Sequence, residues 1–130
     1  MNSFKVVGGN QLKGEIIPQG AKNEALQVIS AVLLSSEKIT IENIPNIHDV
    51  MKLIELLREM NVKIEQISKN VFSFEAKDVN LNYLLSEDFK KKGAGLGGSI
   101  MILGPLLARF GKAFIPEPGG DKIGRRIRLY

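Results

Sequence analysis

Residues 24–34 restrict the possible folds of this chain most strongly, because they form a helix-length run with hardly any polar face. Only Glu24, Gln27 and Ser30 interrupt its apolar residues. This pattern predicts a helix that is buried on most sides, so the rest of the chain has to pack around it. The whole chain has 130 residues, 44% of them hydrophobic, which is enough for the core of one globular unit.

The residues that follow predict the elements that cover this helix. Residues 39–41 read as a strand that ends before Pro45. Residues 47–60 carry apolar side chains at steps of three and four, which is typical of an amphipathic helix with one face in water. Residues 62–67 and 71–74 then predict a hairpin. The expected order from Gly20 onward is helix, strand, helix, strand, strand.

Both ends of the chain add further predictions. Residues 4–17 read as two short strands around Gly8-Gly9, with Pro18 closing the second. Near the other end, residues 99–108 predict a second apolar helix and residues 112–115 a strand. Laid over the first helix and strand with an offset of about 73 positions, these two elements indicate an internal repeat whose second copy is incomplete at Tyr130.

Charge and composition exclude several classes of function. The net charge is +4, but the one local basic run, Lys90-Lys91-Lys92, reads as a solvated helix end, so we expect no nucleic-acid partner. The chain has no Cys, which excludes disulfides, thiolate metal sites and thiol catalysis and fits a reducing cytoplasm. No stretch reaches the roughly 18 apolar residues of a membrane span, and the first residues lack the apolar core of a signal peptide. We therefore expect a cytoplasmic protein without membrane contact.

Two other candidate sites are set aside on the sequence. His48 is the only His and has no cluster of partner residues, so it supports neither Ser-His catalysis nor a metal site. Residues 93–98 are rich in Gly but lack the spaced Lys-Ser/Thr of a phosphate loop. We interpret them as a flexible lead into the second apolar helix.

The first motif that could carry chemistry is Gly20-Ala21-Lys22-Asn23, directly before the first apolar helix. A Gly turn, a helix N-terminus and a Lys ammonium together suit a phosphate or a carboxylate. The alternative is a Lys that simply lies at the surface near a helix start.

The second motif runs from Pro118 to Arg126 and contains three Gly residues around Asp121. Such a loop can bring Asp121 against a ligand, while Arg126 can hold an anion with two hydrogen bonds. The alternative for Asp121 is a polar turn residue or a helix cap.

Taken in order, four stretches resemble the UDP-N-acetylglucosamine enolpyruvyl transferases. They are residues 20–23, the Asn43-Ile44-Pro45 turn with Asp49-Val50, residues 103–111, and Pro118-Gly119-Gly120. The resemblance covers residues 4–126. The sister family that uses shikimate phosphate shares the fold but prefers Ser after the motif Lys, where this chain has Asn23. Asn23 therefore favours the sugar-nucleotide enzymes.

The resemblance implies an α/β (α+β) fold, an inverse α/β prism built from repeated strand and helix units in two similar domains. In such proteins residues 1–20 pack with the other domain, which is absent here, and residues 21–130 form the first repeat and part of the second. The substrates lie between the two domains. The resemblance also implies a monomeric parent protein.

The implied reaction transfers the enolpyruvyl group of phosphoenolpyruvate to the 3′-hydroxyl of UDP-N-acetylglucosamine and releases phosphate, with no metal or organic cofactor. Lys22 and Arg126 would hold the phosphate and carboxylate of phosphoenolpyruvate, and charge that shifts onto these groups would be stabilised by them. Asn23 would bind the sugar nucleotide. Asp121 takes the loop position where many members have a Cys, so Asp121 and Lys22 are the expected catalytic residues.

Two departures from the family pattern lead us to expect no activity from these 130 residues alone. Gly97 stands where many members carry an Arg, and residues 127–130 stand where the family continues to an Asp and a His that help to seat the uridine. The later Asp that is expected to act as base lies beyond Tyr130. The alternatives to a transferase fragment are a non-catalytic module that binds an anion or a partner, and a relative of the shikimate phosphate enzymes.

Overall fold

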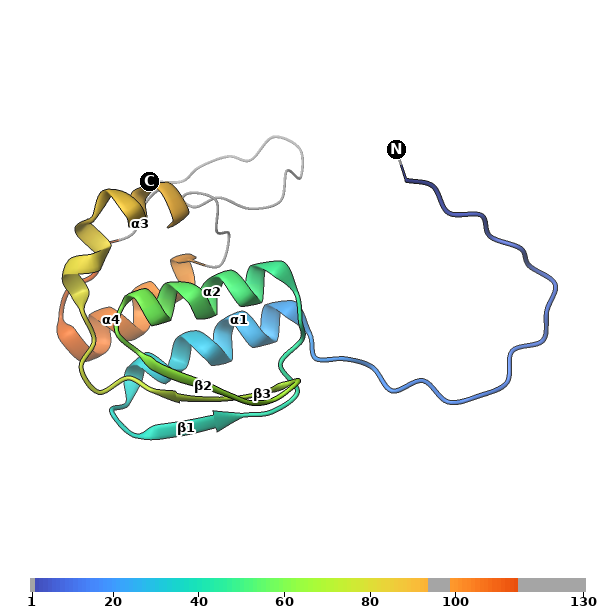
Figure 1. The fold of residues 1–130 in the computed structure, drawn as a ribbon, viewed down its shortest axis with the longest axis horizontal. Coiled ribbons are helices and arrows are strands. Elements are labelled where there is room, and N and C mark those ends of the chain that lie inside the picture. The colour runs from blue at the N-terminus through green and yellow to red at the C-terminus, as the bar shows by residue number, and fades with distance from the viewer. Residues whose placement is uncertain (1, 94–98, 115–130) are drawn as a thin grey trace.

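The chain folds around a three-stranded sheet with helices packed on one face, as the computed structural model shows (Figure 1). The structure describes residues 2–93 and 99–114. Its elements follow in the order α1 (Lys22–Ala31), the 3₁₀ helix η1 (Val32–Leu34), β1 (Lys38–Ile41), α2 (His48–Glu59), β2 (Lys63–Ser68), β3 (Val71–Glu75), the 3₁₀ helix η2 (Leu81–Leu85), α3 (Glu87–Gly93), the 3₁₀ helix η3 (Ser99–Ile102) and α4 (Leu103–Phe110).

The sheet has the strand order β1-β3-β2, and β3 runs antiparallel to both neighbours. Strands β1 and β2 are therefore parallel, and α2 connects them across the sheet with β3 inserted between them. This is a split β-α-β arrangement. Helices α1 and α2 both begin at the same end of the molecule (Figure 1). The candidate site described below lies at this end.

The core lies between the sheet and the helices. Ile39, Phe74 and Ile64 form one row across the three strands, and the rings of Phe72 and Phe74 lie 6.3 Å apart. Helix α2 buries Val50, Leu53, Ile54, Leu56 and Leu57 against this core. The amphipathic pattern of residues 47–60 thus predicted both the helix and its buried face, because the apolar stripe is what packs.

Four predictions along the chain are confirmed: the first helix, the strand at 39–41, the helix at 47–60 and the hairpin. The second apolar helix is also present, as η3 followed by α4. Lys90, Lys91 and Lys92 lie exposed in the last turn of α3, as expected for a solvated helix end.

The two strands predicted at residues 4–17 are wrong for this chain. Residues 2–20 contain no strand, and their apolar side chains are exposed, with Phe4 at 96%. Figure 1 shows this segment, the N-terminal arm, running away from the folded body. A strand needs a partner for its backbone N–H and C=O groups, and the arm pairs with none of the described strands.

The burial expected for the first helix is wrong as well. Helix α1 buries Ala25, Leu26 and Ile29 but leaves Val28 44% exposed, and Leu34 of η1 is 52% exposed. The sheet, α2 and the η3-α4 helix cover one side of α1 only. An apolar sequence allows burial on all sides, but burial occurs only where other elements pack.

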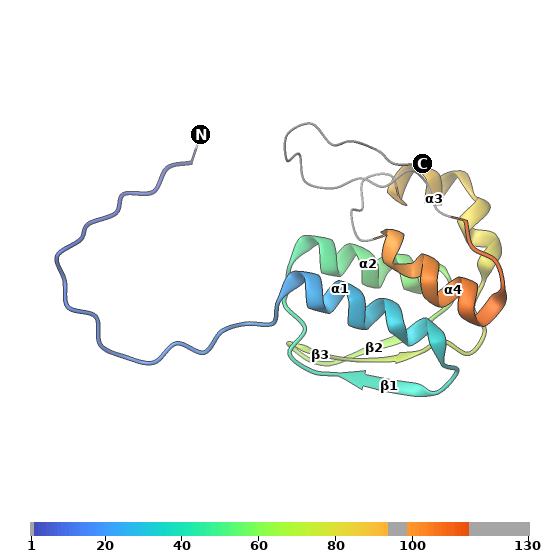
Figure 2. The same cartoon turned by 180° about the vertical axis from the view of Figure 1, so that it is seen from behind.

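The internal repeat is visible in the helices and not in the strand. Ile29 and Leu33 correspond to Ile102 and Leu106 in the repeat alignment, and all four side chains are fully buried. Figure 2 shows α1 and α4 side by side. Residues 112–114 form no strand, which contradicts the prediction for that part, and Ile115 lies outside the described residues.

Candidate functional site

Helix α1 begins at Lys22, within the Gly20-Ala21-Lys22-Asn23 motif. Ala21 precedes it with extended backbone (φ −79°, ψ 136°) and offers no side-chain acceptor to the amides of the first turn. The N-terminal end of a helix carries a partial positive charge. The helix begins at residue 22, two residues before the predicted start at residue 24. Both Lys22 and Asn23 therefore lie in its first turn.

Gly20 allows this helix start to approach the loop after β1. A Cβ atom at position 20 would lie 2.1 Å from the backbone oxygen of Asn43 and 3.1 Å from Cδ of Pro45. Only a residue without a side chain fits such a contact. Asn43 itself has a positive φ of 58°, a conformation that Asn tolerates better than most residues. The two motifs at residues 20–23 and 43–45 are thus in direct contact.

The loop is also held from the hairpin between β2 and β3. The backbone N–H of Ile44 donates to the carbonyl of Asn70 at 2.9 Å, and the Asn70 side chain donates to the carbonyl of Ile44 at 2.7 Å. Ile44 is buried in the core. Two hydrogen bonds and a buried side chain fix the loop that precedes α2, and so fix the start of α2 relative to α1.

Lys22 lies at the meeting point of the two helices. Its Nζ is 3.5 Å from Oδ2 of Asp49, which lies in the first turn of α2. The two side chains are 33% and 37% exposed, so both reach solvent and neither is in the core. Asn23 is exposed beside Lys22. Asp49 belongs to a stretch that carried the resemblance, but no pattern in the sequence indicated a role for it.

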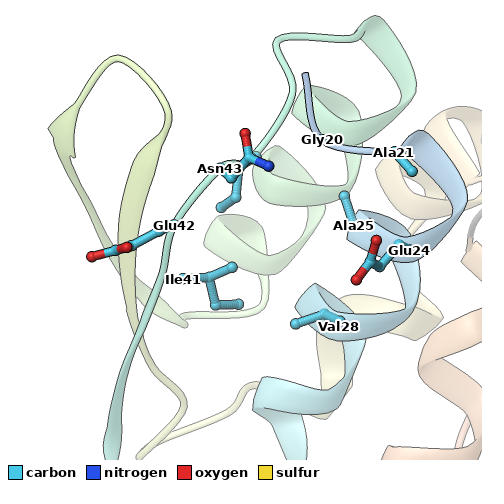
Figure 3. A pocket seen from close by; sticks show the side chains of 9 residues that line it. Gly20, Ala21, Glu24, Ala25, Val28, Ile41, Glu42 and Asn43 are labelled. Carbon is cyan, nitrogen blue, oxygen red and sulfur yellow. The ribbon is translucent and has the colours of Figure 1, made fainter. Parts of the chain in front are cut away.

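A pocket of about 170 Å³ opens next to this helix start, between α1 and the end of β1 (Figure 3). Val28 and Ile41 lie on its walls and Glu24 adds a carboxylate, whereas the side chain of Glu42 points away from α1 (Figure 3). A carboxylate on the wall disfavours a phosphate. We therefore separate this pocket from the cationic end of α1, where Lys22 lies.

Residues Asp121 and Arg126 of the predicted site lie outside the described residues, as does Gly97. Of the predicted site, the structure describes Lys22 and Asn23. Among the described residues there is no cluster of three or more His, Cys, Asp or Glu that could hold a metal ion. Within the same part of the chain, no helix has the length and apolar character needed to cross a membrane.

A second polar cluster joins α3 to the far end of α2. The Tyr83 hydroxyl donates to Oδ2 of Asp88 at 2.6 Å, and Lys92 Nζ lies 3.2 Å from the same oxygen and 3.8 Å from Glu59. Burial is the main cause that raises the pKa of Tyr83 above its ordinary value, and the hydrogen bond to Asp88 and the charge of Asp88 raise it further. The hydrogen bond from Tyr83 is the main cause that lowers the pKa of Asp88, and the hydrogen bond from Lys92 lowers it further. The cluster lies at the opposite end of α2 from Asp49 and links η2 and α3 to α2.

Arg109 is another structural residue, to which the sequence pattern assigned no role. Its Nη1 donates to the backbone carbonyls of Leu33 and Ser35 at 3.0 and 3.1 Å, and its guanidinium lies 4.7 Å from the centre of the Phe110 ring. Arg109 thereby ties α4 to the C-terminal end of η1. It lies within residues 103–111, one of the stretches that carried the resemblance.

The fold defines a class of protein. The structure is similar to the crystal structure of the enolpyruvyl transferase NikO from Streptomyces tendae, with a TM-score of 0.57 and 23% sequence identity over 82% of this chain and 24% of that one. At this level of identity the likeness concerns the fold, which is the α+β fold of the enolpyruvyl transferases.

Residues 6–126 match the EPSP synthase (3-phosphoshikimate 1-carboxyvinyltransferase) family, and the chain belongs to that family. It is 54% identical over 126 residues to a UDP-N-acetylglucosamine 1-carboxyvinyltransferase of Porphyromonas gingivalis and 56% identical to one of Bacteroides thetaiotaomicron. A relative with the same description in Bradyrhizobium diazoefficiens is 41% identical over 123 residues. The chain spans 29% of the length of the first two relatives and 28% of the third.

Proposed function

We propose that the complete protein containing this chain transfers the enolpyruvyl group of phosphoenolpyruvate to the 3′-hydroxyl of UDP-N-acetylglucosamine. The observation that carries this proposal is the identity of 54–56% over 126 residues to relatives described as UDP-N-acetylglucosamine 1-carboxyvinyltransferases. The reaction adds the sugar hydroxyl to phosphoenolpyruvate and then eliminates phosphate from the tetrahedral ketal. It would commit the sugar nucleotide to peptidoglycan synthesis in the cytoplasm, without a metal or organic cofactor.

In this proposal Lys22 and Arg126 hold the phosphate and the carboxylate of phosphoenolpyruvate. The position of Lys22 supports its part: the ammonium reaches solvent at the N-terminal end of α1, where its charge and that of the helix end have the same sign. Two positive groups in one place favour an anionic ligand. Such a site stabilises charge that develops on the phosphate as the ketal breaks down.

Asn23 and Asp121 complete the assignment. Asn23 is exposed in the first turn of α1, and its amide can donate to and accept from a sugar nucleotide. Asp121 would act in proton exchange during addition and elimination, because a carboxylate near cationic groups can take up and release a proton. Its role rests on the position of its loop in the sequence.

The N-terminal arm supports a second domain in the complete protein. Phe4, Leu12 and Ile16 are almost fully exposed in the arm, and burying such side chains stabilises a protein by roughly 1.5–3 kcal/mol each. We propose that residues 1–20 pack with that domain and that residues 21–130 belong to the other one, with the substrates bound between them. The complete protein would act as a monomer.

The competing acceptor is shikimate 3-phosphate, which the description of the family names. An assay of phosphate release from phosphoenolpyruvate by the complete protein separates the two. We expect release with UDP-N-acetylglucosamine and none with shikimate 3-phosphate, and the opposite result would reassign the substrate. If neither acceptor supports release, the chain belongs to a module that binds an anion or a partner without turnover.

A further inference from the structure

Lys22 and Asp49 come from different helices and meet where both helices begin. The distance of 3.5 Å joins the first residue of α1 to the second residue of α2. Figure 1 shows the two helices starting at the same end of the body. The pair therefore lies across two positive helix ends, where an ammonium without a carboxylate would be repelled.

The surroundings keep the two helix starts at a defined separation. Gly20 lies against the backbone of Asn43 and the ring of Pro45, and the carbonyl of Pro45 accepts a hydrogen bond from the N–H of Ile47 at 2.9 Å. Asp49 thus follows a loop that contacts Gly20, two residues before Lys22. The backbone under both side chains is fixed before any ligand binds.

A Lys side chain has four rotatable bonds and a compact charge, so a fixed backbone alone does not orient its ammonium. At 33% exposure Lys22 has room to move, and ordering it costs conformational entropy. A carboxylate at 3.5 Å restricts the ammonium in advance of ligand binding. Pre-organisation of this kind lowers the entropy that the ligand has to overcome.

We propose that Asp49 is a positioning residue, whose carboxylate holds the Lys22 ammonium at the shared N-terminal end of α1 and α2. This inference rests on the proposed function, in which Lys22 contacts phosphoenolpyruvate. Asp49 itself does not touch the substrate. It sets the direction of the ammonium and balances its charge until the anion arrives.

The competing explanation is purely structural. Asp49 lies in the first turn of α2, where a carboxylate stabilises the helix through the helix dipole. In that case its removal would weaken the fold and leave the use of phosphoenolpyruvate unchanged. The two explanations differ in whether the effect of Asp49 depends on Lys22.

A double-mutant cycle in the complete protein tests the difference, with Lys22→Ala, Asp49→Ala and the double variant. We expect Asp49→Ala to lower kcat/KM for phosphoenolpyruvate roughly tenfold, because misplacing a contact group by about 1 Å is enough for such a loss. The KM for UDP-N-acetylglucosamine should stay within about twofold. In the Lys22→Ala background, Asp49→Ala should cost less than about a further twofold, since the group it positions is gone.

Two further variants serve as controls for this experiment. Asp49→Asn keeps the shape and an oxygen that can accept from the ammonium, so its loss should be smaller than that of Asp49→Ala. Glu55→Ala removes an exposed carboxylate from the same helix and should leave kcat/KM within about twofold. Thermal midpoints of all variants report any loss of the folded state.

Equal losses from Asp49→Ala in both backgrounds, or no loss in kcat/KM, would overturn the positioning role. If Lys22→Ala retains full activity, the role of Lys22 in the proposed function fails, and the positioning role fails with it. If Lys22→Ala is inactive and Asp49→Ala is normal, the positioning role alone fails.

Discussion

The contact between Gly20 and Asn43 gives the sharpest prediction of the structure. A Gly20→Ala substitution would put a Cβ 2.1 Å from the backbone oxygen of Asn43. The neighbour is backbone held by the two hydrogen bonds between Ile44 and Asn70, so it cannot turn away as a flexible side chain can. To reach an acceptable contact, the loop or the start of α1 has to move by about 1 Å.

The expected cost follows from two opposing effects. Forcing one extra carbon into a packed site costs typically 1–3 kcal/mol, and a clash with fixed backbone belongs at the upper end. Replacing Gly by Ala also reduces the entropy of the unfolded chain, which returns roughly 0.4–1 kcal/mol. The net loss should be about 2 kcal/mol, which for a domain of this size lowers the melting temperature by about 10 °C.

Urea unfolding of the 130-residue chain, followed by circular dichroism, measures this loss directly. Gly104→Ala is the matched control, because a Cβ at that position in α4 meets no atom within 4 Å. Ala is the better helix former, so the control should stabilise the chain by up to about 1 kcal/mol. A Gly20→Ala variant as stable as the parent, within about 0.5 kcal/mol, would refute the argument that close packing of this loop requires Gly.

Arg109→Ala should destabilise the chain by roughly 2–4 kcal/mol in the same assay, because it removes two charge-assisted hydrogen bonds, whereas Arg109→Lys should retain part of the stability. The lowered pKa of Asp88 means that its contribution is present above the unfolded pKa of about 4 and is lost as the pH falls. Tyr83→Phe should therefore flatten the loss of stability as the pH falls below about 4; an unchanged acid profile would contradict this. The 130-residue chain alone should release no phosphate from phosphoenolpyruvate in the presence of UDP-N-acetylglucosamine, and detectable release would contradict this expectation. The complete protein should resist alkylation by fosfomycin, and Asp121→Cys should gain sensitivity, because a carboxylate is a poorer nucleophile than a thiolate toward an epoxide; an added antibiotic mass on the parent would contradict this.

The sequence alone predicted the elements whose patterns are local. The stripe of apolar residues in α2, the hairpin of β2 and β3 and the strand β1 were all recognised, since spacing along the chain decides which face is apolar. The motif at residues 20–23 also led to the right place, the start of α1, because Gly and the helix start are read from neighbouring residues. The resemblance to the enolpyruvyl transferases, carried by four short stretches, is confirmed at the level of fold and family.

Only the tertiary structure decided what depends on residues far apart in the chain. The pairing of Lys22 with Asp49 and the contact of Gly20 with Asn43 join different elements, and no spacing rule predicts them. The same holds for the exposed side of α1 and for the N-terminal arm, whose sequences favour burial and strand pairing. A hydrophobic pattern states what a segment can bury. Whether it is buried depends on the elements that pack against it, and those are set by the fold of the whole chain.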